Sequence, residues 1–139
     1  MASVNPYLNY NGNCEEAFRF YQSVFGGEFS NIQRFKDIPS QSPLTEQEGE
    51  KIMHIALPVG RNSILMASDV PQYLPQSSMG TNFSISIDTE SEDEARKIFD
   101  GLTSGGQITM PMEKTFWGAF FGMLVDKFGI QWMVGYTYK

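Results

Sequence analysis

Residues 7–21, YLNYNGNCEEAFRFY, decide the fold, because residues 85–99, ISIDTESEDEARKIF, repeat their plan about 78 positions later. Each stretch predicts a strand, a capped turn and an amphipathic helix, and Glu16 of the first falls on Glu94 of the second. Two copies are too few for a solenoid. The repeat therefore predicts two similar modules that close around a shared cleft, which is where a ligand would bind.

The composition is that of a folded globular protein. The chain has 139 residues, of which 41% are hydrophobic and 14% aromatic, and this favours one domain built from module one, about 1–74, and module two, about 79–139. The net charge of −6 argues against a nucleic-acid partner, because phosphate binding needs clustered Lys and Arg. No apolar run is long enough to span a bilayer, and the opening MASVNPYLNY does not resemble a signal peptide, so no membrane association is expected.

The single cysteine, Cys14, bears on both location and chemistry. One cysteine cannot form an internal disulfide, so a reducing compartment and a cytoplasmic location are expected. Cys14 stands in the first turn of a predicted helix, where the helix dipole lowers the pKa of a thiol. No adjacent base is evident in the sequence, so a structural role is expected.

The pattern of apolar residues predicts an α+β fold, with the order βαβββ in each module. In module one the predicted elements are a strand at 5–11, a helix from the Asn13 cap to Gly26, and strands at 28–35, 51–59 and 63–69. In module two they are a strand at 81–88, a helix from the Ser91 cap to about Leu102, and strands at 107–112, 119–126 and 130–137. The polar stretches 37–50 and 70–80 are predicted to be loops.

Motifs at both ends of the chain carry a family resemblance. The opening is PYLNYNGNCEEA at residues 6–17, and the close combines FWG at 116–118 with DKFGIQW at 126–132. With the repeated module, they resemble the PhnB-like branch of the vicinal oxygen chelate superfamily, which includes glyoxalase I, extradiol dioxygenases and bleomycin-resistance proteins. The resemblance implies a glyoxalase/bleomycin resistance-like fold, in which two modules with pseudo-two-fold symmetry form a cupped mixed β-sheet, and it implies a homodimer.

The branch often bears a demethylubiquinone methyltransferase-like label. The sequence has no glycine-rich S-adenosylmethionine-binding loop after its first strand, so methyl transfer is not predicted. Enzymes of the superfamily bind one divalent metal through His, Gln or Glu. The resemblance carries those ligand positions onto Asn5 or Pro6, Asn82 or Phe83, Met66 and Met133. These residue types are poor ligands for a hard divalent ion, so no metal and no other cofactor is expected.

The residues expected to line a ligand site are His54, Met66, Asp69, Trp117, Phe120 and Met133. His54 is either hydrogen-bonded within its sheet or a polar anchor for a ligand. Met66 and Met133 are either core or an adaptable wall. Asp69 is either a turn residue or a base, and the two aromatic residues are either core or a stacking surface. No catalytic residue is assigned.

Three functions fit these observations. The first is a metal-free protein that binds a small molecule in a cleft, as the bleomycin-resistance members do. The second is a metal-dependent lyase, isomerase or dioxygenase with non-standard ligands. The third is an interaction protein whose cleft has lost its ligand. Metal content separates the first two, and the ligand, the reaction and the mode of dimer pairing stay open.

Overall fold

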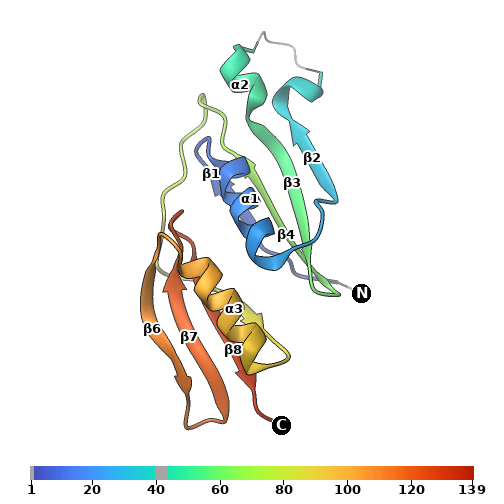
Figure 1. Cartoon of the computed structure of the whole chain (residues 1–139). Coiled ribbons are helices and arrows are strands. Elements are labelled where there is room, and N and C mark those ends of the chain that lie inside the picture. Colours follow the sequence, from blue (N-terminus) through green and yellow to red (C-terminus); the bar gives the residue numbers. More distant parts are fainter. Residues whose placement is uncertain (1, 40–43) are drawn as a thin grey trace. The chain divides into compact units, whose positions relative to one another are not determined.

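The computed structural model describes residues 2–39 and 44–139 and divides the chain into two compact units, Met1–Ser78 and Met79–Lys139 (Figure 1). The predicted modules, about 1–74 and 79–139, have nearly the same bounds. Positions 40–43, inside the predicted loop at 37–50, lie outside the described residues. Within the described ranges, no helix combines the length and the apolar character that a membrane crossing requires.

The first unit is a four-stranded mixed sheet with one long helix. Its elements are β1 (Tyr7–Tyr10), α1 (Cys14–Phe25), β2 (Asn31–Arg34), the 3-10 helix η1 (Phe35–Asp37), α2 (Glu46–Glu50), β3 (Ile52–Val59) and β4 (Ser63–Asp69). The strand order is β1-β4-β3-β2, with β1 parallel to β4 and the other pairs antiparallel.

The second unit repeats this plan. Its elements are β5 (Ile85–Asp88), α3 (Glu92–Thr103), β6 (Gln107–Lys114), β7 (Ala119–Val125) and β8 (Gln131–Thr137). The strand order is β5-β8-β7-β6, and β5 is parallel to β8 as β1 is to β4. The predicted α+β class and the two βαβββ modules are therefore confirmed, and the predicted strands agree with the observed ones to within a few residues.

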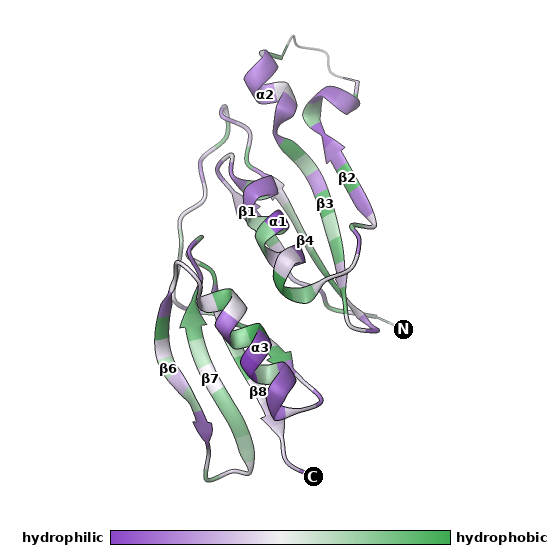
Figure 2. Cartoon of the chain, viewed as in Figure 1, coloured by the Kyte–Doolittle hydropathy of each residue, from purple (hydrophilic) through white to green (hydrophobic). Residues whose placement is uncertain are grey.

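Aromatic side chains join α1 to its sheet. The hydroxyl groups of Tyr10 and Tyr21 lie 3.0 Å apart in the core, and Phe18 meets the ring of Tyr10 edge-on. Cys14 and Ala17 complete the buried stripe of the helix. Figure 2 shows the apolar residues of α1 and of the strands that it covers. This burial supplies most of the free energy that holds the unit together.

A glycine allows α3 to lie close to its sheet. The α3 side chains Ala95, Phe99 and Leu102 are buried. A Cβ atom on Gly122 of β7 would lie 2.9 Å from Cε2 of Phe99, which is closer than real contacts allow. Gly122 is therefore needed for the close approach of the ring.

The two long helices begin differently. The predicted cap at Ser91 is confirmed, since its Oγ accepts a hydrogen bond from the Glu94 amide at 3.1 Å. Asn13 occupies the equivalent position of α1, but its side chain makes no capping hydrogen bond, so that part of the prediction is wrong. Asp69 at the end of β4 replaces it: Oδ1 accepts from the Cys14 amide at 3.0 Å.

The predicted loop at 37–50 is wrong in its last part, which forms α2. Thr45 caps this short helix, because its Oγ1 accepts a hydrogen bond from the Glu48 amide at 3.1 Å. A helix of five residues is too short to show a periodic apolar stripe, and its one signal in the sequence is Thr45 with Glu48 three residues later, the pattern of a helix cap.

Candidate functional site

Strand register gives the first sheet two different faces. Tyr10 points toward α1, as its contact with Phe18 shows. Side chains alternate along a strand, so Tyr7 points to the opposite face, and so does its register partner Met66 on β4. We call the face away from α1 the open face. Around its centre it carries Tyr7, Asn31, Gln33, His54, Ala56, Met66 and Ser68.

His54 stands at the centre of a polar cluster on the open face. Its Nδ1 lies 2.5 Å from Nδ2 of Asn31 on β2. Its ring centroid lies 5.9 Å from that of Tyr7, with the planes tilted by 41°. The Tyr7 hydroxyl in turn lies 3.1 Å from Oγ of Ser68 on β4. His54 is half-buried and Tyr7 is 45% exposed, so the cluster is both ordered and reachable from solvent.

The structure brings two of the predicted site residues together here. His54 and Met66 lie on adjacent strands of the open face and are both half-buried. The ring of His54 is hydrogen-bonded within the sheet, as the first of its two expected roles requires, and it is also partly exposed. Sequence reasoning missed Tyr7, Asn31 and Ser68. Alternation along β4 alone puts Ser68 on the same face as Met66, but the contact of Asn31 with His54 can be recognised only once the register of β2 and β3 is known.

Asp69 does not belong to this cluster. It follows Ser68 in β4 and therefore points toward α1, where it is 3% exposed. Oδ1 accepts from the Gly12 and Cys14 amides at 2.9 and 3.0 Å, and Oδ2 accepts from the Ile52 amide at 2.9 Å. This carboxylate joins β1, α1 and β3, so the geometry gives it a structural role.

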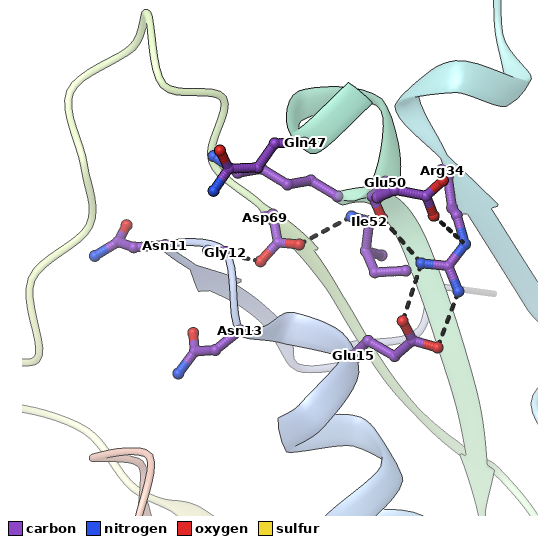
Figure 3. A pocket seen from close by; sticks show the side chains of 10 residues that line it. Asn11, Gly12, Asn13, Glu15, Arg34, Gln47, Glu50, Ile52 and Asp69 are labelled. Carbon is purple, nitrogen blue, oxygen red and sulfur yellow. Dashed lines mark hydrogen bonds and ion pairs between the residues drawn. The ribbon is translucent and has the colours of Figure 1, made fainter. Parts of the chain in front are cut away.

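Asp69 also lines a polar pocket of about 530 Å³ at the N-terminal end of α1 (Figure 3). The pocket is lined by Asn11, Gly12, Asn13, Glu15, Arg34, Gln47, Glu50, Lys51, Ile52 and Asp69. Arg34 donates two hydrogen bonds of 2.9 Å to the Glu15 carboxylate and a third of 2.9 Å to the Glu50 carbonyl. The hydrogen bond from Arg34 lowers the pKa of Glu15, and the same bond raises the pKa of Arg34. The guanidinium of Arg34 and the carboxylate of Glu15 are thus paired with each other within the pocket.

In the second unit the predicted site residues separate. Phe120 is 3% exposed and points toward α3, where the Arg96 guanidinium lies 4.8 Å from its ring centroid. Met133 is half-buried and points to the opposite face. Trp117 is 55% exposed in the turn between β6 and β7 and meets the ring of Phe121 at 5.8 Å. Phe120 is therefore a core residue and does not share a surface with Met133.

The positions implied for a metal do not fit one. Oδ1 of Asn5 already accepts a hydrogen bond from the Ile64 amide at 3.1 Å. Met66 and Met133 offer thioethers, and Phe83 offers no donor atom. Over residues 2–39 and 44–139, no three His, Cys, Asp or Glu side chains are grouped closely enough to hold a metal ion. Hard divalent cations require oxygen-rich sites, so this donor set is unsuited to them.

Cys14 is buried in this structure. Burial raises the pKa of its thiol well above the usual range, and the nearby carboxylates of Asp69 and Glu15 raise it further. The helix dipole was expected to act in the opposite direction, but burial outweighs it. The structural role expected from the sequence is the one the geometry supports.

The closing motif DKFGIQW is also structural. Asp126 Oδ1 accepts from the Phe128 and Ile130 amides at 2.8 and 3.1 Å, and Oδ2 accepts from the indole Nε1 of Trp132 at 2.8 Å. Gly129 has a φ of 89°, which favours glycine. The motif therefore fixes the turn between β7 and β8.

Comparisons with known proteins agree with this fold. The family model described as 3-demethylubiquinone-9 3-methyltransferase matches residues 2–135. The crystal structure of protein PA1353 from Pseudomonas aeruginosa is 39% identical, with a TM-score of 0.85 and 100% of each chain covered.

Two more distant structures extend the likeness. A putative 3-demethylubiquinone-9 3-methyltransferase, PhnB protein, from Bacillus cereus is 25% identical, with a TM-score of 0.77 over 98% of this chain and 100% of that one. A glyoxalase-related enzyme from Fulvimarina pelagi shares the fold, at 18% identity and a TM-score of 0.64 over 99% of this chain and 89% of that one. The chain belongs to the 3-demethylubiquinone-9 3-methyltransferase family, the PhnB-like branch of the vicinal oxygen chelate superfamily.

Proposed function

We propose that this protein binds a small organic molecule on the open face of its first unit, without a divalent metal. The observation that carries the proposal is the position of His54. Its Nδ1 is held by Asn31 and its ring lies against Tyr7, while Met66 adds an apolar side chain on the adjacent strand of the same face. A few oriented polar groups among aromatic and apolar ones are typical of small-molecule sites.

The cluster supports binding better than covalent catalysis. A serine nucleophile needs a base within hydrogen-bond reach, and the hydroxyl of Ser68 has the Tyr7 hydroxyl as its partner. Within the described residues, the ring of His54 is hydrogen-bonded to an amide and to no carboxylate. A triad-like arrangement is therefore not supported, and neither is a nucleophilic role for Cys14, whose thiol is buried.

The alternative, a metal-dependent lyase, isomerase or dioxygenase, finds less support in the residues. Met66 and Met133 fall at the positions that the resemblance assigns to the metal ligands, and a thioether is a soft ligand. The methyltransferase description of the family likewise finds no support in this chain, because the turn after β1 is Asn11-Gly12-Asn13 rather than a glycine-rich loop.

We also propose that the protein is a cytoplasmic homodimer. Cys14 is a buried thiol, which suits a reducing compartment. β6 lies at one end of its sheet, and its exposed side chains include Ile108 and Met110, at 49% and 43%. Exposed apolar residues on a sheet edge favour pairing with a second copy. Light scattering would give the mass of two chains, and the mass of one chain would contradict the dimer.

Binding can be followed at a single residue by NMR, because His54 is the only histidine in the sequence. A library of small molecules is screened by the imidazole proton signals of untagged, chelator-treated protein. We expect at least one compound to shift these signals in a saturable way. Met66→Lys, which puts a charge on the open face, is expected to abolish the shift. The matched control is Met79→Lys, at an exposed position before β5, and an equal loss in both variants would contradict the proposal.

A further inference from the structure

The two nitrogens of His54 have different surroundings. Nδ1 lies 2.5 Å from Nδ2 of Asn31. Among the described residues, Nε2 has no hydrogen-bond partner, and no buried side-chain nitrogen or oxygen atom there lacks one. Nε2 therefore reaches solvent and is available to a ligand on the open face.

The hydrogen bonds of Asn31 indicate which nitrogen of His54 carries the proton. Nδ2 of Asn31 lies 3.4 Å from Oε1 of Gln33, which can only accept. The same Nδ2 is thus a donor, and it donates to Nδ1 of His54 as well. A nitrogen that accepts a hydrogen bond carries no proton in the neutral imidazole. Neutral His54 therefore has its proton on Nε2, where it points to the open face.

The side chains around His54 indicate which charge a ligand of the Nε2–H group should have. The open face around His54 carries tyrosine, asparagine, glutamine, alanine, methionine and serine, with no Lys or Arg among them. Arg34, one residue beyond Gln33, turns to Glu15 and Glu50 instead. Without a cation to neutralise it, a carboxylate or phosphate loses more hydration than a neutral carbonyl on entering such a site.

We infer that Asn31 is a specificity-determining residue, which holds His54 as an Nε2–H donor and selects ligands with a neutral carbonyl oxygen. This inference rests on the proposed binding function and names the ligand class of the same site. The ring of Tyr7 and the thioether of Met66 supply apolar contact for the remainder of such a ligand. A ligand that places a hydrogen-bond donor at this position would face the Nε2–H group with no acceptor between them, so it should bind more weakly.

The proton position can be measured without any ligand. Long-range proton–nitrogen NMR spectra at about pH 9, where an imidazole is neutral, report which ring nitrogen is protonated, and the signals belong to one residue. We expect Nε2–H in the natural protein. Asn31→Asp replaces the amide by a carboxylate that must accept from Nδ1–H, so this variant is expected to move the proton to Nδ1. Asn62→Asp, an exposed position between β3 and β4, has the same change of charge and is expected to keep Nε2–H.

Acetophenone, whose carbonyl oxygen only accepts, and benzylamine, which donates, serve as probes of ligand class. We expect acetophenone to shift the His54 signals of the natural protein and of Asn62→Asp, and to bind Asn31→Asp roughly fivefold more weakly for the loss of one hydrogen bond. Nδ1–H in the natural protein, or equal preference for both probes, would overturn the inference. If Nε2–H is found but no compound of any class shifts His54, the binding proposal fails instead, and the two failures are thus distinguished.

Discussion

Asn31 and His54 lie 23 positions apart in the chain, yet their side chains meet at 2.5 Å across β2 and β3. The contact orients the single imidazole of the protein on the sheet face away from α1. A histidine held in this way is prepared for recognition, because its ring loses little further freedom when a ligand binds. The pairing is local to the first unit, so it requires nothing from the rest of the chain.

Asp69 is expected to be essential for stability rather than for binding. Asp69→Ala leaves the Gly12, Cys14 and Ile52 amides without their acceptor, which should lower the free energy of unfolding by about 3–5 kcal/mol. Urea unfolding measures the loss. The milder Asp69→Asn keeps one acceptor oxygen and should cost about half as much. Asp88→Ala, an exposed aspartate that also ends a strand, should change stability by less than about 0.5 kcal/mol, and equal losses at both positions would contradict the assigned role.

Glu15 should contribute to stability in a pH-dependent way. Its folded-state pKa is lowered, first by the hydrogen bond from Arg34, so the contribution is full above the unfolded-state pKa and is lost as pH falls through the folded-state value. The carboxylate is 37% exposed, so solvent limits the effect to about 1 kcal/mol or less. Unfolding of natural protein and Glu15→Gln should therefore differ at pH 7 and converge in acid.

The control for this test is Glu16→Gln, one residue further along α1. Glu16 is exposed, so its loss should give a smaller difference at pH 7. If the two variants lose the same stability at pH 7, the gap reflects the helix dipole and not the contact with Arg34.

Cys14 should resist modification in the folded protein. Its thiol is fully buried and its pKa is raised, so little thiolate exists at about pH 8. An aromatic disulfide reagent should react with it roughly a hundredfold more slowly than with the unfolded chain. Ser104→Cys in a Cys14→Ser background, with an exposed thiol, is the control and should react at once. Rapid modification of Cys14 without unfolding would contradict its assigned burial.

Gly122→Ala tests the close packing of α3. The added methyl would lie 2.9 Å from Phe99 and 2.7 Å from the sulfur of Met112, which should lower the free energy of unfolding by about 1–3 kcal/mol. Phe99→Leu in the same chain should recover part of this loss by making room. Gly80→Ala meets only one side-chain atom, at 3.4 Å, and should be nearly neutral. A neutral Gly122→Ala would mean that α3 lies further from β7 than described.

The fold could be predicted from the sequence because it repeats. Once residues 7–21 and 85–99 align, both modules have the same order of elements, and polar turns mark the ends of their strands. The pairing of the first strand with the last is seen only in the structure. The site was harder, because it depends on contacts across strands. Periodicity placed His54 and Met66 in strands, and alternation alone puts Asp69 on the face opposite to Met66, but only strand register shows that Asn31 meets His54.

Asp69 also shows why a sequence motif misleads about capping. Asn13 with Glu16 three residues later has the pattern of a local cap, and such a motif says nothing about acceptors from distant parts of the chain. The acceptor used in the structure is a carboxylate 55 positions away from Cys14, which only the packed sheet brings to the start of α1.

Metal content measured together with binding tests the central claim most directly. Untagged protein, purified without chelator, is analysed by inductively coupled plasma mass spectrometry, and a compound that shifts the His54 signals is then titrated before and after chelation. The account predicts far less than one equivalent of any transition metal and the same affinity in both titrations. One equivalent of a divalent metal, with binding at His54 lost on its removal, would contradict the account and favour a metal-dependent enzyme.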